Sequence, residues 1–185
     1  MGRIRNKSFT LVELIVAVGV VALVLPAIFN IFFVIIRQQI VLTAYQDMKR
    51  QGDSIAKNIK YILQNRASQI TDATYLLEVC PLITTPTPTY FPRIYIKDRD
   101  DNSLSIYQDS LNSDKIASLA ALPNKKYFLN TTSVQISQTS PLAFSCYRVN
   151  DFTPASVSVR YTVGKSALFK NVSLPYSFSV RLRNY

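Results

Sequence analysis

The chain has 185 residues and contains neither histidine nor tryptophan. Without histidine, Ser-His-Asp and Cys-His catalytic arrangements, histidine-ligated metal sites and imidazole pH switches are excluded. The two cysteines, Cys80 and Cys146, are too few for a four-thiolate zinc site and too far apart for a redox CxxC motif. The four glycines form no GxGxxG or other phosphate-binding loop. We therefore expect a protein that is not an enzyme and uses no cofactor.

What the chain has in plenty is a long apolar run near the N-terminus. From Leu14 to Ile36 the only polar side chain is Asn30. As a helix, this run measures about 34 Å, enough to cross a hydrocarbon core of about 30 Å. Arg3, Arg5 and Lys7 precede it without an acidic residue, and such a basic start is held on the cytoplasmic side of a membrane. These features predict a single-pass protein of the cytoplasmic (inner) membrane with its C-terminal part outside.

The segment Ser8-Phe-Thr-Leu-Val-Glu13 joins the basic leader to the apolar run. It resembles the class III signal of type IV pilins and type II secretion pseudopilins, in which a small residue, usually Gly, precedes Phe-Thr-Leu-x-Glu. Here Ser8 replaces the glycine. The resemblance implies that prepilin peptidase removes residues 1–8 by cutting between Ser8 and Phe9, and that Phe9 becomes the N-methylated first mature residue. Removal of three cations leaves 18 basic against 11 acidic residues, a net charge of +7.

Glu13 is an acidic residue at the start of an apolar segment, where a carboxylate is costly unless it stays near the headgroups or finds a partner. It either lies at the interface without a role or pairs with another chain. The resemblance implies the second interpretation, because filament subunits of this family bundle their N-terminal helices. Glu13 would attract the Phe9 amine of a neighbouring pilin or pseudopilin, and low dielectric strengthens that attraction. The protein would then leave the membrane for a periplasmic or cell-surface filament.

Pro26 lies within the predicted membrane helix, residues 9–36. It removes one backbone hydrogen bond, so we expect a kink or local loosening of the helix. Asn30, one turn later, could bond to a freed carbonyl or to a neighbouring helix. Local melting during extraction from the membrane and a tolerated kink both remain open.

Residues 37–70 are predicted to continue the helix as an amphipathic segment. A single helix from residue 9 to residue 66 would measure about 87 Å. Gly52 lies within the apolar stripe and permits close approach by another element. The stripe is too short for a favoured coiled coil, so we expect it to pack on a sheet. Its members are Val41, Tyr45, Met48, Ile55, Ile59 and Ile62.

Residues 71–185 are predicted to form an extracytoplasmic, β-rich domain. Residues 71–92 are expected to be a loop, and residues 113–122 a short helix or loop. Alternation of apolar and polar residues predicts strands at 93–97, 104–107, 134–136, 144–149, 157–163 and 178–182. The predicted fold class is α+β: one long helix, half transmembrane and half amphipathic, packed on an antiparallel sheet. The strand order after residue 133 and the ending also resemble J-type pseudopilins and W-type minor pilins.

Two sets of residues in this domain are candidates for a covalent or a metal site. Cys80 and Cys146 lie beyond the membrane; they either pair, which would contribute about 4 kcal/mol, or remain as two buried thiols. Asp98, Asp100 and Asp101 lack the glycine and glutamate of an EF-type calcium loop, so we expect a solvated turn and no metal site.

The first functional hypothesis is a minor pilin or pseudopilin that assembles near the tip of a filament of secretion, motility, adhesion or competence.

The alternative is a DNA-uptake pilin that binds nucleic acid through its basic domain. Residues 125–128 form the only basic-aromatic cluster. Arg160, Arg181 and Arg183 alternate with apolar residues, as cations on the solvent face of strands would. We therefore interpret most of the positive charge as solvated surface.

Overall fold

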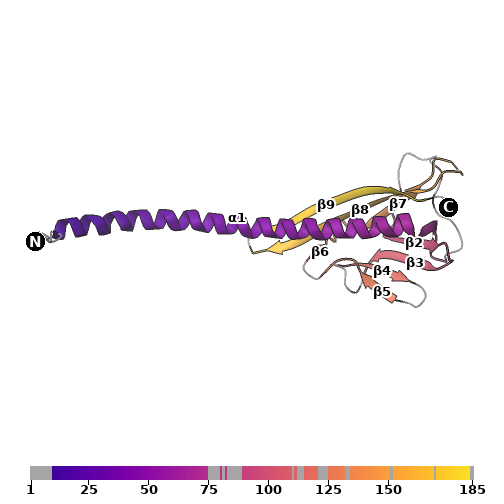
Figure 1. The fold of residues 1–185 in the computed structure, drawn as a ribbon, viewed down its shortest axis with the longest axis horizontal. Helices are drawn as coiled ribbons and strands as arrows, with labels where there is room; N and C mark the ends of the chain where they lie inside the picture. Colours follow the sequence, from indigo (N-terminus) through magenta and orange to yellow (C-terminus); the bar gives the residue numbers. More distant parts are fainter. Residues whose placement is uncertain are drawn as a thin grey trace, which may run out of the picture.

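In the computed structural model the chain is a long helix with a β-rich domain around its C-terminal half (Figure 1). The structure describes residues 10–74, 80, 82, 89–109, 111, 115–120, 125–131, 134–150, 152–168 and 170–183. The α+β architecture, with one long helix packed against antiparallel sheets, confirms the predicted fold class. The predicted leader, residues 1–8, and most of the predicted loop before residue 89 lie outside the described residues.

Helix α1 spans Leu11–Asn65 and continues through Pro26. It ends earlier than the predicted amphipathic segment, which extended to residue 70. Arg66 caps the helix, and the next residues form strand β1, Ala67–Thr71. The prediction was wrong here because Ile70, which continued the apolar periodicity, is instead buried in a strand paired with β2.

The first sheet contains five antiparallel strands in sequence order. The hairpin predicted around residues 98–102 is confirmed, and Asp101 adopts a positive φ of 60° in its turn. A strand replaces the helix or loop expected within residues 113–122, because Ile116 and Ala117 are buried while their backbone pairs on both sides. Its strands after β1 are β2 Arg93–Asp98, β3 Ser103–Gln108, β4 Ile116–Ala120 and β5 Lys125–Phe128.

The second sheet is built around the long strand β8, Ser156–Ala167. Strand β9, Lys170–Arg181, pairs along the whole of β8, while β6, Gln135–Ile136, and β7, Ala143–Tyr147, pair with its two ends. The predicted strands in this region are confirmed, and those at 157–163 and 178–182 are parts of a much longer hairpin.

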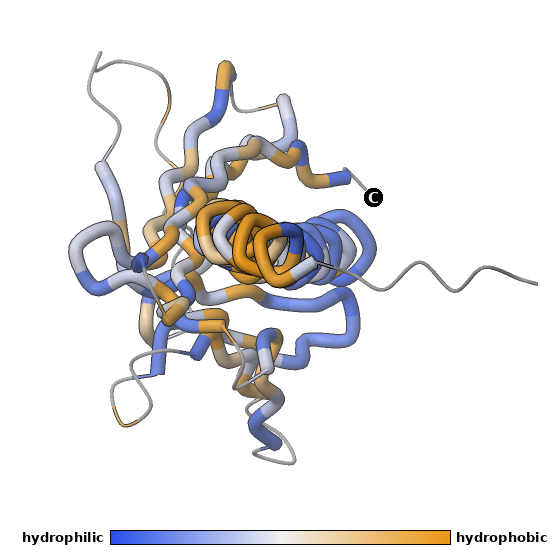
Figure 2. Tube along the Cα trace, turned by 90° about the vertical axis from the view of Figure 1, so that its left-hand side faces the viewer, coloured by the Kyte–Doolittle hydropathy of each residue, from blue (hydrophilic) through white to orange (hydrophobic). Residues whose placement is uncertain are grey.

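The C-terminal half of α1 lies between strands of the two sheets, as the view along the helix shows (Figure 2). The buried positions recur every three or four residues, so one face of the helix contributes to the core. They are Ala44, Met48, Gly52, Ile55, Ile59 and Leu63. This stripe differs from the predicted one at its ends: Tyr45 is exposed and Val41 and Ile62 are only half-buried. Ala44 rather than Tyr45 lies on this face because it precedes Met48 by four residues, about one helical turn.

Candidate functional site

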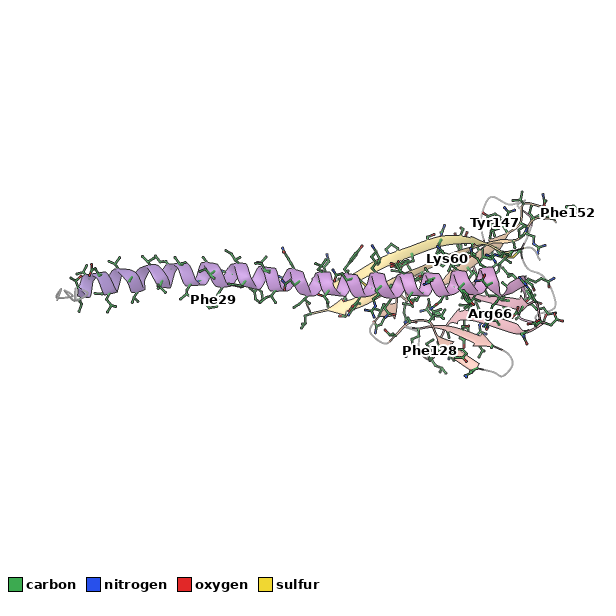
Figure 3. All side chains as sticks on the ribbon, in the orientation of Figure 1. Phe29, Lys60, Arg66, Phe128, Tyr147 and Phe152 are labelled. Atoms are coloured by element: carbon green, nitrogen blue, oxygen red, sulfur yellow. A yellow bond between two sulfur atoms is a disulfide. The ribbon has the colours of Figure 1, made fainter. Side chains whose placement is uncertain are left out.

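The N-terminal half of α1 is an apolar surface that the rest of the chain does not cover. Every residue from 11 to 36 is exposed, and the helix projects well beyond the strands (Figure 1). The side chain of Phe29 points away from the helix in this bare part (Figure 3). The helix is long and apolar enough to cross a membrane. An apolar surface of this extent needs a non-aqueous environment, which a bilayer or a bundle of similar helices provides.

Glu13 takes part in capping the N-terminus of this helix. Its Oε2 accepts hydrogen bonds from the backbone N–H of Thr10, at 2.9 Å, and from Thr10 Oγ1, at 3.0 Å. Thr10 Oγ1 in turn accepts a bond of 3.3 Å from the backbone N–H of Glu13. This capping box satisfies groups that a helix start leaves unpaired. The Thr-x-x-Glu spacing before an apolar run is the sequence signal that predicts such a cap.

The other residues singled out near the N-terminus are placed as follows. Ser8 and Phe9, the predicted cleavage and methylation site, lie outside the described residues. Pro26 and Asn30 lie in the bare part of the helix, one turn apart. The helix is continuous at Pro26, and its loosening during extraction from the membrane stays a prediction.

Gly52 lies in close contact with the β8–β9 hairpin, which confirms the close approach predicted for it. Tyr161 on β8 donates its hydroxyl proton to the carbonyl oxygen of Gly52, at 2.8 Å. Tyr176 on β9 donates to the carbonyl of Lys49, at 3.0 Å, and the two tyrosine rings stack with centroids 5.2 Å apart. A Cβ at position 52 would collide with the Tyr176 ring.

Burial at this contact changes the ionisation of both tyrosines. Desolvation raises the pKa of Tyr161 well above its usual value and that of Tyr176 to about 12, and the nearby carboxylate of Asp53 adds to both shifts. Closer to the bare segment, Lys165 on β8 forms an ion pair with Asp47 on α1. The hydrogen bond and charge of Lys165 lower the pKa of Asp47. The helix is thus held to the hairpin by polar as well as apolar contacts.

Cys80 and Cys146 form a disulfide between residues 66 positions apart. Both are buried, and Cys146 lies in β7. Leu82 and Arg148 form a parallel bridge beside it. The disulfide thus attaches the segment before β2 to the second sheet.

The basic-aromatic cluster at residues 125–128 is strand β5, and all four of its residues are exposed. On the same sheet the Arg93 guanidinium lies 3.8 Å from the centroid of the Tyr107 ring, and the Lys126 ammonium 5.2 Å from that of Phe128. Lys126 also forms a 2.8 Å ion pair with the buried carboxylate of Asp109, and this hydrogen bond raises the pKa of Lys126. Part of the cluster's charge is therefore balanced within the domain.

The remaining candidate residues lie on the surface. Arg160, Arg181 and Arg183 are exposed on or beside β8 and β9, as predicted for the solvent face. In the 98–102 turn, Asp98 accepts a hydrogen bond from the backbone N–H of Arg99, and Asp101 pairs with Lys97 at 3.1 Å. Within the described part of the chain, no group of three or more acidic, cysteine or histidine residues could hold a metal ion.

No family model matches this chain, and no curated protein or solved structure matches it either. The bare apolar helix, the capping box at Glu13 and the disulfide-closed domain are therefore the features on which its function is inferred.

Proposed function

We propose that this chain is a structural subunit, a minor pilin or pseudopilin, that enters a type IV pilus-like or type II secretion filament through the N-terminal half of α1. The observation that carries the proposal is the division of one continuous helix, Leu11–Asn65. Its first half is apolar and bare, whereas its second half is part of the domain core. A helix attached so firmly at one end can display its domain while the other end is shared with sister helices.

The geometry of Glu13 is compatible with a role between subunits. Both hydrogen bonds to its carboxylate end on Oε2, so Oε1 remains able to accept a proton donor. The amine of Phe9 in a neighbouring chain would be such a donor once the leader is removed. A carboxylate and an ammonium in an apolar bundle each carry a desolvation cost, which their pairing offsets. The capping box would hold Glu13 in one rotamer and so define the axial register.

The first test is the mature N-terminus. The full chain is expressed in cells that contain a prepilin peptidase, and its N-terminal peptide is analysed by mass spectrometry. We expect a peptide that begins with N-methylated Phe9. A chain that keeps Met1 in such cells contradicts the proposal.

The second test separates assembly from folding. We expect Glu13→Ala to accumulate in the membrane with its Cys80–Cys146 disulfide formed, yet to be depleted from sheared filaments. Asp100→Ala is the matched control, because Asp100 is an exposed acid in the β2–β3 turn, at the opposite end of α1 from Glu13. Equal incorporation of both variants would remove the proposed role of Glu13.

A second candidate function, nucleic-acid binding, is favoured by the cations stacked on aromatic rings across β2–β5. Single-stranded nucleic acid binds surfaces that combine exposed rings with positive charge. Its test is binding of a fluorescent oligonucleotide to the full chain in detergent at low and high salt. Binding that weakens with salt and with Arg93→Ala supports it; the absence of binding at low salt excludes it.

A further inference from the structure

The turn that joins β8 to β9 has an unusual composition. Ala167 pairs with Lys170, and in the sequence the two residues between them are Leu168 and Phe169. Two-residue hairpin turns normally use Gly, Asn or Asp, because these residues adopt the required backbone angles. Leu168 is 83% exposed, and Phe169 lies outside the described residues. An apolar turn in this position suggests an environment other than water.

The turn lies beside α1 near the end of the bare segment. Lys165 is level with Asp47, and Leu168 is three residues further along β8. At about 3.3 Å per strand residue this is about 10 Å, equivalent to about seven helix residues. The turn therefore lies alongside about residues 40–43 of α1, because the Tyr161–Gly52 and Lys165–Asp47 pairs show that four strand residues span five helix residues. In agreement, Ile40 and its neighbour at 41 are half-buried, and the hairpin reaches further toward the N-terminal end of α1 than the other labelled strands (Figure 1).

This position corresponds to the polar layer of a bilayer. Ile36 ends the apolar run, and Ile40 lies about 6 Å beyond it along the helix. The polar layer on each side of the hydrocarbon is about 5–7 Å thick. The exposed Lys170 follows the turn, and Arg37 directly follows the apolar run of α1. Apolar side chains flanked by cations are typical of segments that bind at the surface of a membrane.

We propose that the β8–β9 turn is a second, interfacial membrane contact. Leu168 enters the boundary between acyl chains and headgroups of the extracytoplasmic leaflet, and Lys170 lies next to anionic lipid phosphates. This inference rests on the proposed function, in which the bare half of α1 spans the membrane before the subunit enters a filament. The contact would fix the tilt of the domain over the bilayer, and a subunit that leaves for a filament would have to release it.

The experiment uses the full chain in vesicles of phosphatidylethanolamine and phosphatidylglycerol. Because the chain's two native cysteines form a disulfide, Leu168→Cys introduces a single reactive thiol for an environment-sensitive fluorophore. Phe29→Cys is the reference for the spanning segment. Phe152→Cys is the reference for solvent, because Phe152 is 91% exposed and lies at the opposite end of the domain (Figure 3). Lipids with nitroxides at shallow or deep positions serve as quenchers.

We expect the label at position 168 to be blue-shifted relative to that at 152, and quenched about twofold more by shallow than by deep nitroxides. The label at position 29 should be quenched by the deep nitroxides. If position 29 is quenched but position 168 behaves like 152, the interfacial contact is overturned and membrane residence stands. If position 29 is not quenched, the spanning state in the proposed function fails as well.

A charge test examines the lipid headgroup. Lys170→Glu should reduce shallow quenching at position 168 in vesicles with phosphatidylglycerol, but not in vesicles of phosphatidylcholine alone. Lys125→Glu is the matched control, because Lys125 is exposed on β5, remote from the turn. Equal effects of the two substitutions overturn the contact with anionic lipid. Protection of position 168 that appears only at high protein density overturns the lipid contact in favour of a second copy of the chain.

Discussion

Tyr161 and Gly52 connect the two halves of the fold: the tyrosine hydroxyl of β8 donates a 2.8 Å hydrogen bond to the glycine carbonyl of α1, 109 residues earlier in the chain. Tyr176 stacks on Tyr161 and occupies the space beside the glycine. The C-terminal half of α1 is thereby attached to the middle of strand β8. The bare segment projects from this attachment, so the contact determines how the domain is oriented relative to the apolar helix.

Gly52→Ala should lower the free energy of unfolding by about 1–3 kcal/mol, because the new methyl group displaces the Tyr176 ring. The measurement is chemical denaturation of the full chain in detergent micelles. Gly19→Ala is the matched control: a Cβ there meets nothing within 4 Å. We expect the control to be as stable as the unchanged chain. Equal stability of the two variants would contradict the close approach.

Stability should fall at high pH through the two tyrosines. Their pKa values are raised in the folded state, that of Tyr176 to about 12, so the unfolded chain releases its protons first. The unfolding free energy should be constant below the ordinary tyrosine value of about 10 and then decrease as pH rises toward 12. Denaturation midpoints measured between about pH 8 and about pH 12 test this decrease. The double substitution Tyr161→Phe, Tyr176→Phe should flatten the decrease, and an unchanged slope would argue against the assignment.

Loss of the disulfide should lower the free energy of unfolding by about 3–4 kcal/mol, because the disulfide closes a loop between residues 66 positions apart. The measurement compares denaturation midpoints of the oxidised chain with those of Cys80→Ser, Cys146→Ser. Addition of a reductant should lower the denaturation midpoint of the unchanged chain but not that of the double variant. A midpoint that reductant does not move, while free thiols appear, would contradict a stabilising disulfide.

Removal of the Asp47–Lys165 ion pair should loosen the end of the hairpin that lies nearest the bare segment of α1 more than the whole domain. The pKa of Asp47 is lowered by Lys165, so the stabilisation is present at neutral pH and is lost as pH falls through the carboxylate's titration. Asp47→Asn should accelerate amide hydrogen exchange in residues 165–172 at pH 7. Lys97→Met, which removes the exposed pair with Asp101, should leave exchange in the hairpin unchanged.

The periodicity of the chain was sufficient to predict most of the secondary structure of the domain. Strict alternation in the strand at 157–163 reflects one buried face, with Val157, Val159 and Val163 inside the core. Residues 67–71 were misassigned because Ile70 fits both the helical period and a strand, and only its pairing with β2 distinguishes the two. The strand at 116–120 was missed because its small residues are buried on both faces and show no alternation.

The sequence was enough to predict an apolar helix with an acid at its start near the N-terminus, because length and hydropathy along one helix are local properties. It also placed Gly52 on the packed face. Long-range packing settles the rest: Cys80 meets Cys146, Tyr161 and Tyr176 fill the space beside the glycine, and the β8–β9 hairpin meets α1 at Asp47. These contacts join residues far apart in the chain, so they depend on how the sheets pack around α1.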